Sequence, residues 1–171
     1  MLFNSHNFIF IFFPIVLILY FLFHKDYKFR LTILTYASIC FYAYWDFKYT
    51  GLLLISILVN YALSFLVKKK NRIAFFLAIF LNLLILGIFK YLGMFMDFFE
   101  YVSKKDTIKI DLILPLGISF FTFQQIAFQI DNFNSKVKIP KLSEYFFFIT
   151  FFPQIIAGPI VHHKEIFSQI K

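Results

Sequence analysis

The sequence predicts an all-α membrane protein built from about six hydrophobic helical segments. Hydrophobic residues make up 61% of the 171 residues and charged residues only 15%. Soluble domains are typically about half apolar and a quarter charged, so this chain lacks the polar residues that would cover a water-exposed surface. Long uncharged stretches alternate with short gaps that hold most of the Lys and Arg residues. Lipid is therefore the predicted solvent of most of the chain.

The uncharged stretches have the lengths of membrane-spanning helices. A helix needs roughly 20 apolar residues, with a usual range of about 17–25, to cross a hydrocarbon core about 30 Å thick. All but one stretch reach this range, and the short second stretch is expected to be extended by snorkelling of Arg30 and Lys48. The predicted segments are Met1 to Phe23, Leu31 to Trp45, Tyr49 to Val67, Ile73 to Phe89, Leu112 to Ile130, and Tyr145 to Val161.

The first stretch is interpreted as a retained span and not as a cleaved signal peptide. No basic residue precedes its apolar run and no small-x-small cleavage site follows it. Pro14 lies inside this stretch, and a kink at proline is tolerated in a membrane helix.

The gaps between the stretches predict the orientation, because Lys and Arg are concentrated in cytoplasmic loops. The first, third and fifth gaps fall on one side and are the predicted cytoplasmic loops, so the N-terminus is expected to be extracytoplasmic. Their basic residues are Lys25, Lys28 and Arg30, then Lys68, Lys69, Lys70 and Arg72, then Lys136, Lys138 and Lys141. The fourth gap, Lys90 to Asp111, falls outside, and its Met94 to Val102 part is a candidate interfacial helix.

The last two stretches are more polar than the others. Unsatisfied amides are costly in hydrocarbon, so these segments are expected to face protein or a water-filled cavity. Their Pro and Gly residues predict helices that are broken or re-entrant instead of simple spans. Their polar and helix-breaking residues are Pro115, Gly117, Ser119, Thr122, Gln124, Gln125 and Gln129, then Pro153, Gln154, Gly158 and Pro159.

The net charge of +8 does not indicate a nucleic-acid partner, because the basic residues lie in the gaps where membrane proteins meet lipid headgroups. Cys40 is the only cysteine, which excludes an intrachain disulfide and a cysteine-based metal site. It is expected to pack as a small hydrophobic residue. No zinc spacing, paired carboxylate or Gly-rich phosphate loop is present, so no metal and no tightly bound cofactor is predicted.

Three motifs carry a family resemblance. They are LPLGISFFTFQ at Leu114 to Gln124, FFPQIIAGPI at Phe151 to Ile160, and LGIFKYLGMFMDFF at Leu86 to Phe99. Together with the opening stretch and the YASICFYAYW segment, they resemble the membrane-bound O-acyltransferase family, in the branch of the alginate O-acetyltransferase membrane component. The resemblance covers residues 1–171 and is carried mainly by the first two motifs.

The resemblance implies a multi-helix membrane domain pierced by a tunnel. An acyl group passes from a cytoplasmic donor, acetyl-CoA or another acyl thioester, to a hydroxyl of an extracytoplasmic polymer. Alginate, other exopolysaccharides, peptidoglycan and teichoic acid are acceptors among the relatives, and a partner protein often completes the transfer. The expected location is the cell (inner) membrane.

One departure from the family concerns catalysis. The family's catalytic histidine lies well downstream of the Phe151 to Ile160 motif, and the sequence stops at Lys171. Residues 1–171 are therefore interpreted as the N-terminal part of the domain, with no catalytic residue and no activity alone. A C-terminal half or a second protein is the expected partner. His162 and His163 are interpreted as interfacial histidines and not as general bases.

The candidate tunnel or substrate residues are polar or helix-breaking positions of the two specific motifs: Ser119, Gln124, Pro153, Gln154, Gly158 and Pro159. Gln124, Gln125 and Gln154 could each donate a hydrogen bond to a thioester carbonyl, or could form a hydrogen bond between helices. The lone amides Asn60 and Asn82 are expected to form helix–helix hydrogen bonds. The alternative function is a non-enzymatic membrane scaffold or transporter subunit, since transporters also use Pro/Gly-broken helices.

Overall fold

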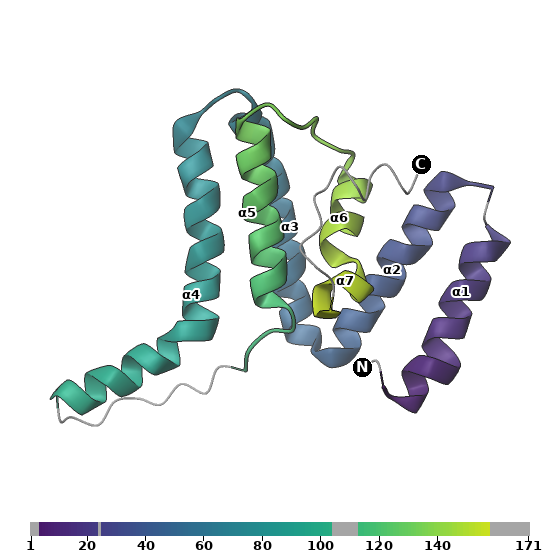
Figure 1. The fold of residues 1–171 in the computed structure, drawn as a ribbon, viewed down its shortest axis with the longest axis horizontal. Coiled ribbons are helices and arrows are strands. Elements are labelled where there is room, and N and C mark those ends of the chain that lie inside the picture. The colour runs from purple at the N-terminus through teal and green to yellow at the C-terminus, as the bar shows by residue number, and fades with distance from the viewer. Residues whose placement is uncertain (1–3, 24, 104–112, 158–171) are drawn as a thin grey trace.

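The computed structural model describes residues 4–23, 25–103 and 113–157, and every regular element in these ranges is a helix (Figure 1). A π-helical turn, η1, precedes seven α-helices in chain order. The bounds are η1 Phe8–Phe12, α1 Phe13–Leu22, α2 Tyr27–Trp45, α3 Phe47–Lys68, α4 Arg72–Ser103, α5 Ile118–Phe133, α6 Leu142–Thr150 and α7 Phe152–Ala157. The predicted all-α class is confirmed for the described residues.

Two of these helices are long and apolar enough to cross a membrane. They are α3, with a mean hydropathy of 2.1, and α4, with 2.4; Phe8–Leu22 forms a shorter apolar helix. Most of the surface of α3 and α4 faces outward and carries large apolar side chains, which a soluble protein would bury. The chain is a membrane protein.

Local capping explains where several helices begin. The carboxylate of Asp26 accepts hydrogen bonds from the backbone N–H groups of Lys28 and Phe29 at 2.8 and 3.4 Å. Asp46 does the same at the start of α3. In the apolar N-terminal segment, the π-helical turn ends at Phe12, two residues before Pro14, which has no N–H to offer to the regular helical ladder.

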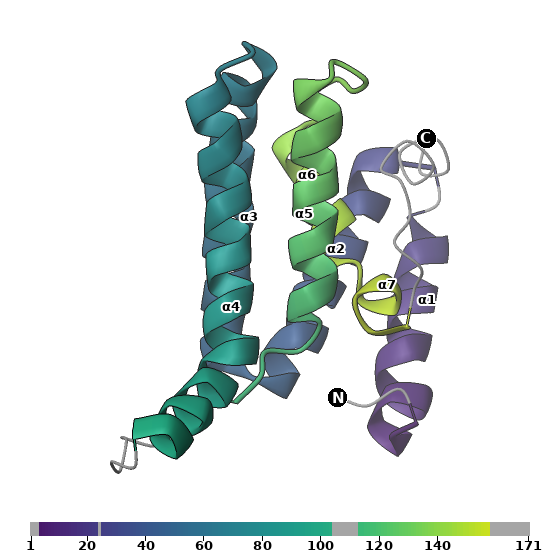
Figure 2. The same cartoon turned by 60° about the vertical axis from the view of Figure 1, so that its left-hand side comes forward.

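The described helices form one bundle (Figures 1 and 2). The long helices α3, α4 and α5 pack against one another, and α6 and α7 fill the space between α5 and α2. Helix α1 packs mainly on α2 at the opposite side from α4. The central core includes Tyr42, Ile57 and Leu86 with Phe128 and Tyr145, so α2 to α6 all contribute to it.

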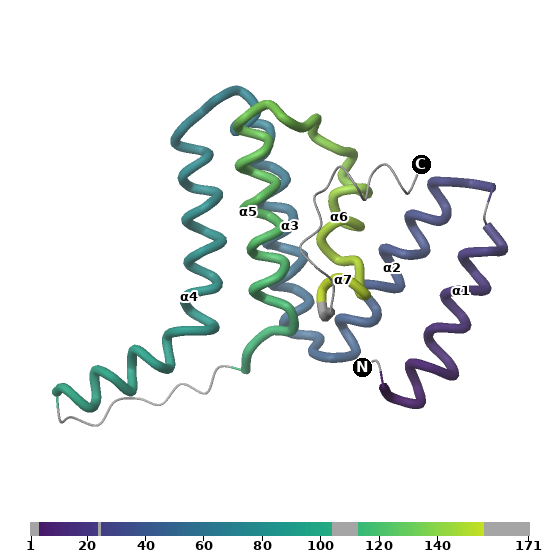
Figure 3. Tube along the Cα trace, in the orientation of Figure 1, coloured from purple at the N-terminus to yellow at the C-terminus, as the bar shows by residue number. Residues whose placement is uncertain are grey.

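The predicted segment boundaries differ most from the helices in three places. Helix α4 continues to Ser103, well past the predicted end at Phe89, and its last part turns away from the bundle (Figure 3). Helix α5 begins only at Ile118, after Pro115 and Gly117. The sixth stretch divides into α6 and α7, because Phe151 between them leaves the helical conformation at φ −51° and ψ 107°.

The basic gaps gather at one end of the bundle. The start of α2, the turn between α3 and α4, and the loop between α5 and α6 lie at the same end of the bundle, which is the upper end in Figure 1. Lys68 Nζ donates to the carbonyl oxygen of Val137, and Lys70 Nζ donates to that of Phe133, which joins the third gap to the fifth. The odd-numbered gaps therefore share one end, as expected for helices that alternate in direction.

A hydrogen bond joins the first gap to the same end. The Tyr27 hydroxyl donates to Glu144 Oε1 at 3.0 Å, and Glu144 Oε2 accepts from the backbone N–H of Lys141 at 3.0 Å. Burial, together with the neighbouring Glu144 carboxylate, raises the pKa of Tyr27 to about 12. The hydroxyl therefore stays protonated at physiological pH and continues to tie the start of α2 to the start of α6.

Candidate functional site

The two proline-containing motifs meet in space at Gly117. This residue precedes α5 and adopts the left-handed conformation, with φ +65°. A Cβ atom at this position would lie 2.6 Å from Cγ2 and 2.8 Å from the carbonyl oxygen of Ile155 in α7. Glycine is thus required both by the backbone conformation and by the close approach of α7. The Leu114–Gln124 and Phe151–Ile160 motifs form one structural unit.

The third motif joins the same core. Leu86 of α4 is buried in one hydrophobic cluster with Ile118 and Phe121 of α5 and with Ile155 of α7, and Phe89 packs against that cluster. The three segments that carry the family resemblance therefore converge on one hydrophobic cluster, although about 70 residues separate the first from the last.

An aromatic cluster holds α7 against the N-terminal helices. The Phe152 ring lies 5.3 Å from Phe41 of α2 and 5.5 Å from Phe12 of η1, measured between ring centroids. Phe8 packs edge-on to both Phe41 and Phe152. The backbone N–H of Phe152 also donates to Ser38 Oγ at 3.3 Å. These contacts fix the start of α7, and with it the residues that follow Phe152.

The structure describes four of the six residues proposed from sequence. Gln124 and Gln154 are buried, whereas Ser119 and Pro153 are half-buried. Ser119 lies in the first turn of α5 and Gln124 in its second, while Pro153 and Gln154 lie in α7. Because Gly117 contacts Ile155, these four positions belong to the motif unit described above. Gly158 and Pro159, like His162 and His163, lie outside the described residues.

A second polar feature, which we call the amide seam, runs between α3 and α5. Ser56, Asn60 and Ser64 of α3 face Gln125, Gln129 and Asn132 of α5, and all six are buried. The amide nitrogens of α5 donate to Ser56 Oγ at 3.1 Å, to the Asn60 carbonyl at 2.7 Å and to the Ser64 carbonyl at 2.7 Å. The seam fixes the register of the two helices within the apolar bundle.

Helix α4 joins the seam through Asn82. Its Nδ2 donates to Asn60 Oδ1 at 2.7 Å and to the carbonyl oxygen of Ala78 at 2.8 Å. Asn60 Nδ2 in turn donates to the carbonyl oxygen of Ser56 at 3.0 Å. The predicted helix–helix bonding of the two asparagines is confirmed, and so is the helix–helix interpretation of Gln125.

Several acceptors on α5 are buried without a donor in the described part of the chain. They are Thr122 Oγ1, Gln124 Oε1, Gln125 Oε1, Gln129 Oε1 and Asn132 Oδ1. Apart from that of Gln124, they belong to residues spaced three or four positions apart, on one stripe of the helix. Buried amide oxygens accept hydrogen bonds from water, hydroxyl or amide groups. The seam contains no carboxylate, imidazole or thiol, so it can position a group but cannot transfer a proton.

The sequence interpretation missed Ser56, Ser64 and Asn132, and it noted Gln129 only as a polar residue. The signal was available in the spacing, because Ser56, Asn60 and Ser64 recur every four residues within an apolar stretch. This spacing places them on one face of a helix, where a second polar stripe would match them.

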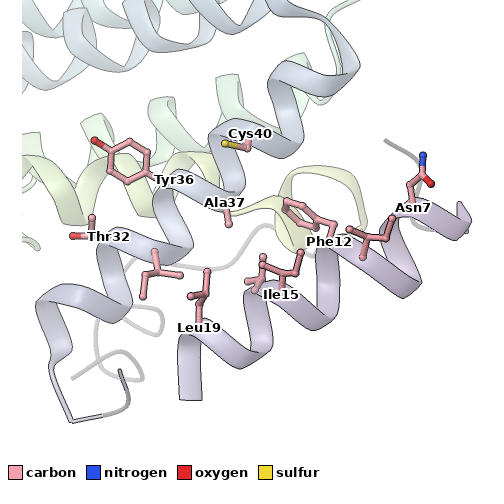
Figure 4. A pocket seen from close by; sticks show the side chains of 11 residues that line it. Asn7, Phe12, Ile15, Leu19, Thr32, Tyr36, Ala37 and Cys40 are labelled. Carbon is pink, nitrogen blue, oxygen red and sulfur yellow. The ribbon is translucent and has the colours of Figure 1, made fainter. Parts of the chain in front are cut away.

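A cavity of about 570 Å³ lies between the N-terminal segment and α2 (Figure 4). Its walls are mainly apolar and include Phe12, Ile15, Leu19 and Tyr36. Cys40, which was expected to pack as a small hydrophobic residue, lines this mainly apolar cavity as well and is exposed. Apart from that thiol, the cavity offers little acid–base or nucleophilic chemistry. Among the described residues, no group of three His, Cys, Asp or Glu side chains could hold a metal ion.

The comparisons with known proteins cover the whole chain. A peptidoglycan O-acetyltransferase of Helicobacter pylori is 36% identical in an alignment 204 residues long. The alignment covers 100% of this chain and 39% of the relative. A probable alginate O-acetylase AlgI of Pseudomonas putida is 31% identical over 99% of this chain and 37% of its own length. The corresponding protein of Pseudomonas aeruginosa is 30% identical over 99% of this chain and 34% of its own length.

The chain thus spans little more than a third of the length of the curated relatives it matches. No protein-family model matches it. No solved structure matches it either.

Proposed function

Because the chain belongs to the membrane-bound O-acyltransferase family, in the branch of the alginate O-acetyltransferase membrane component, we propose that it forms the N-terminal part of a membrane O-acyltransferase. The complete enzyme transfers an acetyl or other acyl group to hydroxyls of an extracytoplasmic polysaccharide such as peptidoglycan or alginate. The names of the relatives support this substrate class.

The observation that carries the proposal is the convergence of the three motifs. Gly117 and Ile155 are in contact, and Ile155 belongs to the same cluster as Leu86. Segments that resemble a family in sequence and also pack together in space support a shared function more strongly than apolar spans would. The chemistry of the motifs is accordingly assigned to the surface that they build together.

The proposed role of this surface is to position the acyl thioester. We assign Gln124 and Gln154, with Ser119 and Pro153 of the same two helices, to the tunnel wall. Gly158 and Pro159 are assigned to it from the sequence motif alone. The buried Gln124 Oε1 has no donor in the described part of the chain, which suits contact with an amide N–H or a hydroxyl of a donor or acceptor. Gln125 is assigned a structural role, since its amide nitrogen bonds Ser56.

The reaction is an acyl transfer from sulfur to oxygen. The acceptor hydroxyl oxygen attacks the thioester carbonyl carbon, a C–O bond forms, the C–S bond breaks, and the thiol leaves with the proton of the hydroxyl. A general base is needed to move that proton. We assign it to the family's histidine, which the resemblance places beyond residue 171, and accordingly propose that residues 1–171 are inactive alone.

The distribution of charge supports an orientation for this enzyme. The basic gaps gather at one end of the bundle, where three hydrogen bonds connect them. Their donors and acceptors are Lys68 and Val137, Lys70 and Phe133, and Tyr27 and Glu144. The positive-inside rule assigns that end to the cytoplasm. The proposed protein is multi-pass, lies in the inner membrane and has an extracytoplasmic N-terminus, so its thioester donor approaches from the basic end.

The test is reconstitution of the complete enzyme from its parts. Residues 1–171 would be expressed alone, or together with the polypeptide encoded after codon 171, and ester-linked acetate would be measured on purified peptidoglycan and exopolysaccharide. We expect ester only when both parts are present. A several-fold loss of ester in Gln124→Leu at unchanged protein level, but not in the neighbouring exposed Phe123→Leu, would support the assigned wall.

The opposite result is equally informative. If no combination yields ester while residues 1–171 accumulate stably in the membrane, the acyltransferase proposal fails and the scaffold or transporter-subunit function takes its place.

A further inference from the structure

The last part of α4 forms an arm that leaves the bundle. Phe89 is the last residue of α4 that packs against the core, where its ring lies 5.5 Å from that of Tyr49. The buried residues of α4 all precede it. Residues 91–103, which we call the arm, turn sideways from the bundle axis in Figures 1 and 3.

The length of α4 explains why the arm cannot continue across the membrane. A straight helix of 32 residues would be about 48 Å long, whereas the hydrocarbon core is about 30 Å thick. The first part of α4 packs along α3 and α5 and is the most apolar candidate span of the described chain. The arm therefore begins where α4 has already reached the boundary between acyl chains and headgroups.

The arm has two distinct faces. Gly93, Asp97 and Glu100 follow one another at spacings of four and three residues, which places them on one side of the helix. The opposite side carries large apolar residues that are between 58% and 66% exposed: Met94, Phe95, Phe98, Phe99 and Val102. An apolar face of this size is not left in water.

We propose that the arm lies in the plane of the membrane, with Phe95 and Phe98 inserted among the acyl chains and Asp97 and Glu100 facing the aqueous side. The partner is the lipid interface, because the arm is covalently continuous with the spanning part of α4. The end of the spanning part places the arm at the boundary between acyl chains and headgroups, where the chain turns sideways. Interfacial helices of this kind bury their apolar face about 5–10 Å into the headgroup and acyl boundary.

The charges of the arm refine the mode of binding. Its ionisable side chains, besides its two tyrosines, are the carboxylates of Asp97 and Glu100. Anionic headgroups would repel these carboxylates, so attachment depends on apolar insertion and not on electrostatic attraction by the arm itself. Tyr91 at the start and Tyr101 near the end carry hydroxyls that suit the headgroup level.

The test is a nitroxide scan of the arm. Cys40 is replaced by Ser, single cysteines are placed in turn at residues 93–102, and the labelled chain is reconstituted into vesicles of phosphatidylethanolamine and phosphatidylglycerol. Collisions with oxygen, which concentrates in lipid, and with a water-soluble nickel chelate are then compared. Phe80, which lies near the middle of the spanning part and is exposed in the structure, serves as the deep control, and Lys69 serves as the aqueous control.

We expect the ratio of oxygen to nickel collisions to oscillate with the helical period. The ratios at Phe95 and Phe98 should be several-fold above those at Asp97 and Glu100, and below the ratio at Phe80. The proposal is overturned if labels at Phe95 and Phe98 are immobile and shielded from both reagents, because that result would show that protein covers the apolar face of the arm. It is also overturned if they are as accessible to nickel as Lys69. Neither result depends on acyl transfer, so the proposed function is tested separately.

Discussion

Gly117 joins two segments that are far apart in the sequence. Its φ of +65° is a conformation that other residues adopt at a cost of about 1–2 kcal/mol, and the α7 backbone leaves no room for a Cβ atom. The carbonyl oxygen of Ile155 cannot move away without moving the whole of α7. A single hydrogen-to-methyl change at this position therefore acts on the start of α5 and on α7 together.

Gly117→Ala is predicted to destabilise the chain by more than about 2 kcal/mol, because conformational strain and the clash with Ile155 add. Unfolding in mixed micelles with an increasing fraction of denaturing detergent measures the change. Gly51→Ala is the matched control, since a Cβ at this helical position meets nothing within 4 Å and alanine is favoured in helices. Equal stability of the two variants would contradict the proposed contact.

At the scale of the elements, the amide seam determines how α3, α4 and α5 fit together. Apolar side chains supply little driving force for association in lipid, where the surrounding solvent is equally apolar. Hydrogen bonds and close packing must then select the register. Asn60 lies at the centre of the seam, because it bonds Asn82 through its side chain and accepts from Gln129 through its carbonyl oxygen.

A double-mutant cycle on Asn60→Ala and Asn82→Ala is predicted to give a coupling free energy of about 0.5–1.5 kcal/mol. The side chains exchange bonds of 2.7 and 3.4 Å, so removing either one leaves the other without its partner. Detergent-induced unfolding of the four proteins supplies the cycle. A matching cycle on Asn60 with the exposed Leu84 should give no coupling. Additive effects for the asparagine pair would show that they do not interact.

At the scale of the whole molecule, the N-terminal helices and the last described helix depend on each other. Phe152 brings α7 to α2 and η1, and Gly117 brings α7 to α5. Helix α7 has only six residues and would not be stable alone. The position of α7 is thus set both by the N-terminal helices and by α5.

Phe152→Ala is predicted to cost roughly 3 kcal/mol, because it empties the centre of a packed aromatic cluster that includes Phe8 and Phe41. Phe10→Ala serves as the control, since the Phe10 ring is 70% exposed. Limited proteolysis in detergent should show new cleavage near α7 in the first variant only. Unchanged protection in Phe152→Ala would mean that the cluster does not hold α7.

Much of the fold follows from local patterns. The apolar stretches predict the helices and the lipid environment, and Pro115 and Gly117 predict that the fifth stretch is interrupted. The sequence did not predict that α4 continues as one helix to Ser103. Lys90 ends the uncharged stretch but does not end the helix. Asp97 and Glu100 interrupt an apolar stretch, but on a helix they occupy one face.

The sequence by itself determined the membrane class, the family resemblance and the expectation that Asn60 and Asn82 each bond between helices; that they bond each other came from the structure. These properties depend on composition, on motifs, and on the high cost of an unpaired amide in lipid. Only the tertiary structure decided that Ser64 and Asn132 bond across α3 and α5, and that Ile155 packs on Gly117. Such contacts join residues separated by 38 to 68 positions, and their partners depend on helix rotation and register, which no local pattern specifies.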